Sequence, residues 1–236
     1  MPKSDLICYI ILAFAALLSF KTGKLSAVAA LTGLLVALLI YQGSGYTGIA
    51  MLALFFIAGS WATSWQYQQK VLLGAAEQRH GRRTPGQVLA NSGVAAITGL
   101  VCRLDPNLSA MLQLMMAGSL AAATADTLSS ELGTLYGRRF YHILSLRPGQ
   151  RGLDGVISLE GTLIGIIGSA LVALVYALGH RWGWPVLWVI IAGTAGNLAD
   201  SVLGATLERK GMIGNNLVNF LNTLTGALTI WLLSAL

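Results

Sequence analysis

Four carboxylates lie in or at the ends of long apolar stretches of this chain: Asp126, Glu131, Glu160 and Asp200. A charged side chain at the centre of a bilayer costs at least about 2.5 kcal/mol, so it normally faces a polar interior, a partner or an ion. Most of the nine acidic residues fall between Asp126 and Glu208. Several carboxylates in one region of an apolar chain indicate a site for a polyvalent cation or a proton path.

Helical spacing groups the first of these carboxylates with other polar side chains. Ser129, Ser130 and Gly133 follow Asp126 at i+3, i+4 and i+7, which is one face of a helix. Glu131 follows Asp126 by five positions and points about 140° away from it on an unbroken helix. We therefore expect Asp126 to face a polar site and Glu131 to serve a different neighbour.

Two further polar stripes lie towards the C-terminus. The first contains Asn197, Asp200, Ser201, Gly204 and Glu208, and the second contains Asn215, Asn219 and Asn222. Each stripe follows helical spacing and only a short turn separates them, so they can meet across an antiparallel helix pair. Asparagines also hydrogen bond between membrane helices without any catalytic role, at on the order of 0.6 kcal/mol each. Three on one face beside a carboxylate favour a polar site.

The segment 137–161 combines glycines with four arginines, Arg138, Arg139, Arg147 and Arg151. Arginine makes bidentate, charge-assisted contacts with phosphate oxygens. The N-terminus of a helix expected near Ser158 would add free amides and a favourable dipole. Mg²⁺ prefers one or two carboxylates together with phosphate and water, so Asp126 or Asp200 could hold it against these oxygens. The chain contains no P-loop motif, and its scattered histidines argue against a histidine metal site.

Membrane helices are the elements that must position these residues. Hydrophobic residues make up 55% of the 236 and charged residues 10%, whereas a soluble domain has about 25% charged residues. We predict a single integral membrane domain over residues 1–236, an all-α polytopic bundle of about eight helices, because helices satisfy their own backbone groups in lipid. The predicted helices cover residues 5–20, 25–41, 46–66, 86–103, 108–135, 156–179, 185–207 and 214–235.

Basic residues mark one face of the predicted bundle. Lys21, Lys24, Lys70, Arg79, Arg82, Arg83, Arg138, Arg139, Arg147, Arg151, Arg209 and Lys210 fall in loops after odd-numbered helices, and only Arg103 and Arg181 in loops after even-numbered ones. Because positive loops stay on the cytoplasmic side, we expect the site there, with both termini on the opposite side, and a bacterial chain in the inner membrane. Much of this charge only sets topology, so a basic loop counts as a site when other chemistry accompanies it.

At these segments the chain resembles the domain-of-unknown-function 92, or transmembrane protein 19, family, which includes plant and cyanobacterial phytyl-phosphate kinases. The resemblance is carried by Arg83 with Gln87-Val-Leu-Ala-Asn91, Thr124-Ala-Asp126-Thr127 with Ser130-Glu131-Leu-Gly133, Pro148-Gly149 with Gly155-Val-Ile-Ser158-Leu-Glu160-Gly161, and Asn197-Leu-Ala-Asp200-Ser201 with Gly204. The middle region is more distantly similar to polyprenol and phytol kinases. Those relatives carry a lysine before the serine that matches Ser158, so Arg147 or Arg151 would have to replace it here.

The resemblance implies a CTP-dependent kinase that phosphorylates an isoprenoid monophosphate to its diphosphate. Asp126 and Asp200 would bind Mg²⁺ and, with Glu131, form the catalytic set. The predicted substrate-binding residues are Arg83, Asn91, Thr127, Ser130, Arg147, Arg151, Ser158, Glu160, Asn197, Ser201, Asn215 and Asn219. The expected partners are a nucleoside triphosphate, with CTP favoured over ATP, a prenyl or phytyl monophosphate, and the lipid bilayer, and no nucleic acid.

Two other functions fit the same residue types. A lipid-phosphate or ion transporter would also use carboxylates, asparagines and small-residue helices, but it requires a polar path that reaches the non-cytoplasmic side. A membrane cytidylyltransferase would use similar groups and release pyrophosphate. The strongest motifs cluster near one face of the predicted bundle, which favours the kinase over the transporter.

Overall fold

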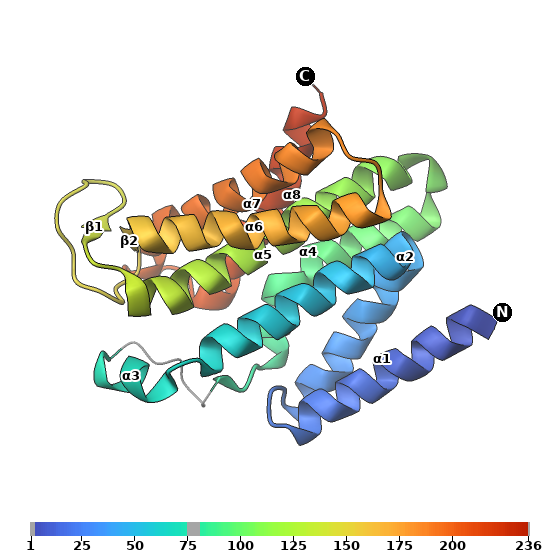
Figure 1. Ribbon diagram of the computed structural model, residues 1–236, viewed down its shortest axis with the longest axis horizontal. Helices are drawn as coiled ribbons and strands as arrows, with labels where there is room; N and C mark the ends of the chain where they lie inside the picture. Colours follow the sequence, from blue (N-terminus) through green and yellow to red (C-terminus); the bar gives the residue numbers. More distant parts are fainter. Residues whose placement is uncertain (1–2, 75–80, 236) are drawn as a thin grey trace.

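The computed structural model describes residues 3–74 and 81–235 and shows a bundle of long helices (Figure 1). The helices are α1 (Lys3–Lys21), α2 (Ala27–Ser64), α3 (Tyr67–Leu72), α4 (Pro85–Leu104), α5 (Ser109–Tyr136), α6 (Leu159–Gly179), α7 (Trp184–Leu203) and α8 (Asn215–Leu233). Strands β1 (Phe140–His142) and β2 (Val156–Ser158) form a small antiparallel hairpin. Six of the described helices are long and apolar enough to cross a membrane, so the predicted all-α membrane bundle is confirmed.

Helix α2 is a bent element that accounts for two of the predicted helices. Its arms join at Gly45, whose φ of 59° and ψ of −145° are not helical and suit glycine. A straight helix of its 38 residues would be about 57 Å long, nearly twice the hydrocarbon core of about 30 Å. The bend turns the second arm back from the first (Figure 1), so each arm has about the length of one crossing.

Helix α5 lies at the centre of the bundle and packs against α2, α4, α6, α7 and α8. Its buried face is built largely from alanines, with Ala117, Ala121 and Ala125 fully buried. Small side chains let neighbouring backbones approach closely, which is the main source of helix packing in lipid, where apolar burial alone gives no driving force between helices. The helix that carries Asp126 is therefore surrounded on several sides.

Two glycine pairs bring α5 into backbone contact with its neighbours. A Cβ added to Gly118 would stand 2.7 Å from the carbonyl oxygen of Gly226 on α8. A Cβ added to Gly133 would stand 2.7 Å from the Cα atom of Gly161 on α6. Even alanine would clash at these positions, so α5 is held against α8 near its middle and against α6 near its C-terminal end.

The start of the sixth predicted helix differs from the structure. The prediction began this helix at residue 156, but β2 occupies those positions and α6 begins at Leu159. The β-branched side chains of Val156 and Ile157 favour an extended backbone. Ser158 then ends the strand and caps the helix, because its Oγ atom accepts a hydrogen bond from the backbone N–H of Gly161 at 3.1 Å.

The loops after odd-numbered predicted helices gather at one end of the bundle. The backbone N–H of Arg83 donates to the carbonyl oxygen of Lys24 at 3.0 Å, and Nε1 of Trp65 donates to the hydroxyl of Tyr136 at 2.7 Å. The Arg209 guanidinium donates to the carbonyl oxygen of Asp154. We call this the basic end.

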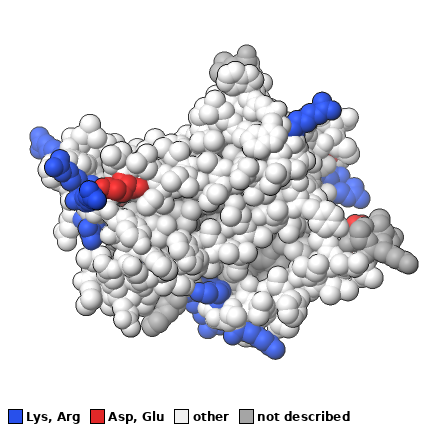
Figure 2. Space-filling model, viewed as in Figure 1, with Lys and Arg blue, Asp and Glu red and all other residues white. Residues whose placement is uncertain are grey.

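A different set of contacts closes the other end. Nε2 of Gln113 donates to the carbonyl oxygen of Gly43 at 2.8 Å, and His180 lies 3.1 Å from the Gln113 side-chain oxygen. Figure 2 shows the charged side chains at the edges of one face, around a broad uncharged middle. The cytoplasmic orientation of the basic end stays a prediction, and Arg79 lies outside the described residues.

Candidate functional site

A polar cavity of about 1100 Å³ opens at the basic end. It is enclosed by the ends of α2, α4, α5, α6, α7 and α8 together with the loop at residues 137–158. Most of the predicted site residues line it: Arg83, Asn91, Asp126, Thr127, Ser130, Glu131, Ser158, Asn197, Asp200, Ser201, Asn215 and Asn219. Arg147, Arg151 and Glu160 lie outside it. The fold thus brings together polar residues that are more than a hundred positions apart in sequence.

Asp126 of α5 and Asp200 of α7 face each other in the cavity. Their carboxyl groups lie within hydrogen-bonding reach of one another. The Oδ1 atom of Asp200 is buried and has no hydrogen-bond partner among the described residues. Two carboxylates this close repel each other unless a proton or a cation lies between them. The pair is therefore suited to holding a cation.

Three more carboxylates line the same cavity: Glu131, Asp154 and Glu208. Asp154 and Glu208 act electrostatically on Asp200, and Glu131 and Glu208 act on Asp126. Sequence reasoning placed Glu208 only in the polar stripe of the seventh helix and did not single out Asp154, whose position in an exposed loop resembles that of any solvated acid. The cavity is consequently rich in negative charge.

Buried asparagines lie at the cavity and beside the aspartate pair. Asn222 of α8 is fully buried, and its amide lies beside the carboxylate of Asp200. Asn91 of α4 donates from Nδ2 to the carbonyl oxygen of Gln87 at 3.0 Å, but its Oδ1 atom has no hydrogen-bond partner within the part of the chain that the structure describes. The polar stripes of α7 and α8 therefore meet. An unpaired buried amide oxygen is costly, and Asn91 lines the cavity, so its Oδ1 atom indicates a ligand that would complete it.

Glu131 has a partner that the sequence did not reveal. Nζ of Lys70 lies 2.5 Å from Oε2 of Glu131 and also donates to the carbonyl oxygens of Ala62 at 2.6 Å and Thr63 at 3.4 Å. The Lys70 side chain is only 1% exposed. Sequence reasoning counted Lys70 as one of the basic residues that set topology. Helix α3 folds back so that Lys70 reaches α5, and no local pattern indicates this long-range pairing.

Arg83 is the predicted arginine that reaches the cavity. Its guanidinium packs over Gly59 of α2, where an added Cβ would stand 2.6 Å from Nη2, and it lies 5.0 Å from the ring centroid of Phe55. Arg82 also lines the cavity. Thr84 follows these arginines as the N-cap of α4, and it exchanges hydrogen bonds with Gln87 in a capping box.

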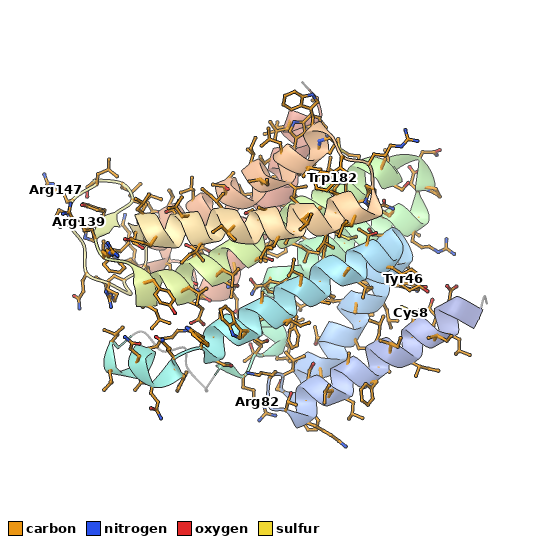
Figure 3. All side chains as sticks on the ribbon, viewed as in Figure 1. Cys8, Tyr46, Arg82, Arg139, Arg147 and Trp182 are labelled. Atoms are coloured by element: carbon orange, nitrogen blue, oxygen red, sulfur yellow. The ribbon has the colours of Figure 1, made fainter. Side chains whose placement is uncertain are left out.

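The other predicted arginines have different surroundings. Arg147 stands at the exposed outer part of the loop, as Figure 3 shows. Arg151 donates to the carbonyl oxygen of Gly137 at 3.0 Å and stacks 4.8 Å from the ring centroid of Phe140. Glu160 accepts from the backbone N–H of Arg138 at 3.4 Å. Arg151 and Glu160 therefore contact parts of the loop, and the arginines at the cavity are Arg82 and Arg83.

The loop reaches the cavity through a glycine. Gly155 has a φ of +69°, and an added Cβ would stand 2.3 Å from the Cβ of Ala205 in the π-helical turn Gly204–Glu208. This close contact places Asp154 at the cavity wall. Glycine is required both by the left-handed backbone conformation and by the space available. The loop is thereby closed onto the end of α7.

The first turn of α8 also faces the cavity. Its lining includes Gly214, Asn215, Asn216 and Leu217. The N-cap residue is Gly214, which has no side chain that could cap the helix. The backbone N–H of Leu217 donates to the carbonyl oxygen of Gly214 at 2.9 Å, whereas the other N–H groups of a first helical turn have no partner within the helix and carry a partial positive charge. They can bind phosphate oxygens.

The residues present fit a magnesium ion that is completed by a substrate. Among residues 3–74 and 81–235, no group of three or more histidine, cysteine, aspartate or glutamate side chains is close enough to hold a metal ion alone. Mg²⁺ characteristically takes one or two protein carboxylates and fills its other positions with phosphate and water. Asp126 and Asp200, with the unpartnered Oδ1 of Asp200, supply that number of carboxylates.

Comparison with known proteins identifies the relatives of this chain. It is 34% identical over 196 residues to an uncharacterized membrane protein of Synechocystis sp., covering 81% of this chain and 76% of that protein. It is 31% identical over 211 residues to the protein "VTE6, chloroplastic" of Arabidopsis thaliana, covering 86% of this chain and 63% of that protein. It is 33% identical over 184 residues to an uncharacterized membrane protein of Methanocaldococcus jannaschii, covering 78% and 75%.

No solved structure matches the chain significantly. The family of integral membrane proteins DUF92 matches residues 10–227, which is nearly the whole sequence and includes every residue that lines the cavity. The chain therefore belongs to the DUF92 family of integral membrane proteins.

Proposed function

We propose that the protein transfers the terminal phosphoryl group of a nucleoside triphosphate, CTP in preference to ATP, to a prenyl or phytyl monophosphate and so forms the diphosphate. The observation that carries the proposal is the facing pair Asp126 and Asp200 in a cavity that also holds two arginines and the first turn of α8. The chain resembles a family that includes phytyl-phosphate kinases, and this resemblance supports the same reaction.

The charge of the cavity is consistent with Mg²⁺ as the companion of the nucleotide. Five carboxylates and two arginines line it, so a polyanion would be repelled unless cations entered with it. Mg²⁺ held by Asp126 and Asp200 would neutralise charge on the phosphates and align them. Arg83, Arg82 and the N–H groups at the start of α8 would bind the remaining phosphate oxygens.

The chemistry demands positioning more than proton transfer. A phosphate monoester loses its second proton with a pKa of about 6, so the lipid phosphate is mostly a dianion at neutral pH. One of its oxygens forms a bond to the terminal phosphorus while the bond from that phosphorus to its bridging oxygen breaks, and the nucleoside diphosphate leaves with the bridging oxygen. No proton is gained or lost, so the carboxylates need not act as bases.

The shape of the bundle supports an enzyme rather than a transporter. A transporter needs the polar cavity to continue to the opposite end. Between the two ends, the described helices pack around fully buried apolar side chains, among them Met51, Met116 and Leu120. The opposite end is closed by the contacts of Gln113 and His180.

The test incubates purified protein with Mg²⁺ and phytyl, farnesyl or geranylgeranyl monophosphate, using CTP or ATP labelled in either the α- or the γ-phosphate. Label from the γ-position in a lipid diphosphate supports the kinase. Label from the α-position in the lipid, with release of pyrophosphate, identifies a cytidylyltransferase instead. No labelled lipid from any combination would refute both enzyme functions.

Matched substitutions then test the carboxylate pair. Asp126→Asn and Asp200→Asn keep the side-chain shape and remove the charge, so each should reduce phosphoryl transfer by at least about a hundredfold. Asp105→Asn is the control, because Asp105 caps a short turn at the opposite end through a hydrogen bond that asparagine can also accept. Full activity in both cavity variants would remove the metal assignment.

A further inference from the structure

A second, apolar groove of about 520 Å³ adjoins the polar cavity. It runs along the outside of the bundle between the first arm of α2, helix α4 and the start of α8. Asn216 and Leu217 line both the groove and the polar cavity, and Gly86 of the groove lies between Thr84 and Gln87, which line the cavity. The two spaces therefore meet where α4 and α8 begin, at the side of the cavity that carries the first turn of α8.

The groove is long and lined mostly by apolar side chains. On α4 its lining extends from Gly86 to Leu100, a distance of about 21 Å along the helix. Ala90, Gly93 and Ala96 provide small side chains along its length. Larger apolar side chains of α2, α4 and α8 stand beside them, and on α4 the groove ends at Leu100, one turn before the end of the helix.

We propose that this groove holds the single hydrocarbon chain of the lipid phosphate while its phosphate group lies in the polar cavity. The inference rests on the proposed function and adds to it the location of the chain. An amphiphile with one charged group and one chain requires a polar site that continues into an apolar one, and the shared residues Asn216 and Leu217 provide that continuity. A diacyl lipid has two chains, for which this one groove provides no second position.

The groove acts by positioning rather than by adding affinity. A chain that moves from the bilayer into the groove exchanges one apolar environment for another, so little free energy is gained. A chain lying along α4 nevertheless directs the phosphate towards Asn216 at the entrance of the cavity. Chain length should therefore control the rate of phosphoryl transfer through alignment of the reacting phosphate.

Photolabelling tests the location directly and does not require turnover. The full-length protein in phosphatidylcholine vesicles is irradiated with a prenyl monophosphate analogue that carries a diazirine at the far end of its chain. We expect labelled peptides from the distal groove, around Leu39, Ile97 and Leu100, and competition by unlabelled geranylgeranyl monophosphate but not by phosphatidic acid. Labelling elsewhere, or equal competition by phosphatidic acid, would overturn the inference.

Substitutions inside the groove test it through substrate selection. A Cβ at Gly93 would stand 3.9 Å from the Phe220 ring, an ordinary contact, so Gly93→Leu fills the middle of the groove without a backbone clash. Its rate with C20 monophosphates should fall about tenfold relative to its rate with C5 monophosphates. Leu100→Trp, at the distal end, should affect only the longest chains.

Ala53→Trp is the control, because Ala53 is exposed on the second arm of α2 and lies outside the groove. An unchanged chain-length profile in Gly93→Leu, with activity retained, would overturn the inference while the proposed kinase stands. Specific labelling of the groove without phosphoryl transfer from any nucleotide would support the groove as a site for a lipid phosphate and would refute the proposed kinase.

Discussion

Removal of either partner of the ion pair between Lys70 and Glu131 should destabilise the protein strongly, whereas removal of both should not. At the observed separation of 2.5 Å, the gross attraction is about 7 kcal/mol for an effective dielectric constant of about 20, and desolvation of both groups offsets several kcal/mol of it. Glu131→Gln leaves a lysine that is 1% exposed with only backbone carbonyl acceptors. Its expected cost is about 3–5 kcal/mol.

Lys70→Met should cost less, about 1–3 kcal/mol, because the Glu131 side chain is 12% exposed and faces the cavity, where water can partly solvate it. The double variant Lys70→Met/Glu131→Gln removes both charges, so its loss should be only about 1 kcal/mol. The assay measures the free energy of unfolding in mixed micelles by denaturant titration with tryptophan fluorescence.

The double-mutant cycle gives a clear refutation. If the losses of the two single variants add to that of the double variant within about 0.5 kcal/mol, the two side chains are not coupled and the pairing plays no part in stability. Lys24→Met provides the matched control, since Nζ of Lys24 donates to the surface hydroxyl of Ser64 at 2.6 Å. Its expected loss is below about 1 kcal/mol.

Three further predictions concern the loop, the metal and the orientation. Gly155→Ala should detach the 137–158 loop from Ala205 and abolish phosphoryl transfer without unfolding the bundle, and limited proteolysis should then cleave the loop faster. Gly211→Ala is the control and should stay active, because Gly211 also has a φ of +69° but an added Cβ would meet no atoms within 4 Å. Chelation by EDTA should stop transfer and added Mg²⁺ should restore it, and activity that persists in EDTA would contradict the metal assignment. In vesicles of known sidedness, Arg147→Cys should react with an impermeant thiol reagent added on the cytoplasmic side, and Trp182→Cys should react with reagent added on the other side. The reason is that these exposed side chains lie at opposite ends of the bundle (Figure 3). The opposite pattern of labelling would reverse the predicted orientation.

The helices and the polar stripes could be predicted from the sequence because they depend on local patterns. Apolar runs of spanning length define the helices, and even the bend in α2 coincides with the break that was predicted between residues 41 and 46. Helical spacing placed Asp126 and Asp200 on polar faces, and the structure brings both to one cavity. These features follow from the chemistry of residues that are close together in the chain.

Contacts between distant segments could not be predicted in this way. The arginine content of the 137–161 segment predicted phosphate binding. In the structure, however, Arg151 stacks on Phe140 within the loop, and Arg147 is exposed away from the cavity. Lys70 of α3, which pairs with Glu131, has neighbours in sequence like those of a lysine that only sets topology. Whether a charged side chain points into a cavity depends on how the helices pack, and the spacing of residues within one helix does not contain that information.

The two glycine contacts of α5 have a consequence for motion during turnover. Asp126 lies between Gly118 and Gly133, about 10–12 Å along the helix from each. Because backbone meets backbone at both points, α5 cannot slide or rotate against α6 and α8 without separating them. The position of the Asp126 carboxylate is therefore preorganised before any ligand arrives. Ligand entry and release must be accommodated by elements with looser contacts, such as α3, which reaches α5 through the side chain of Lys70.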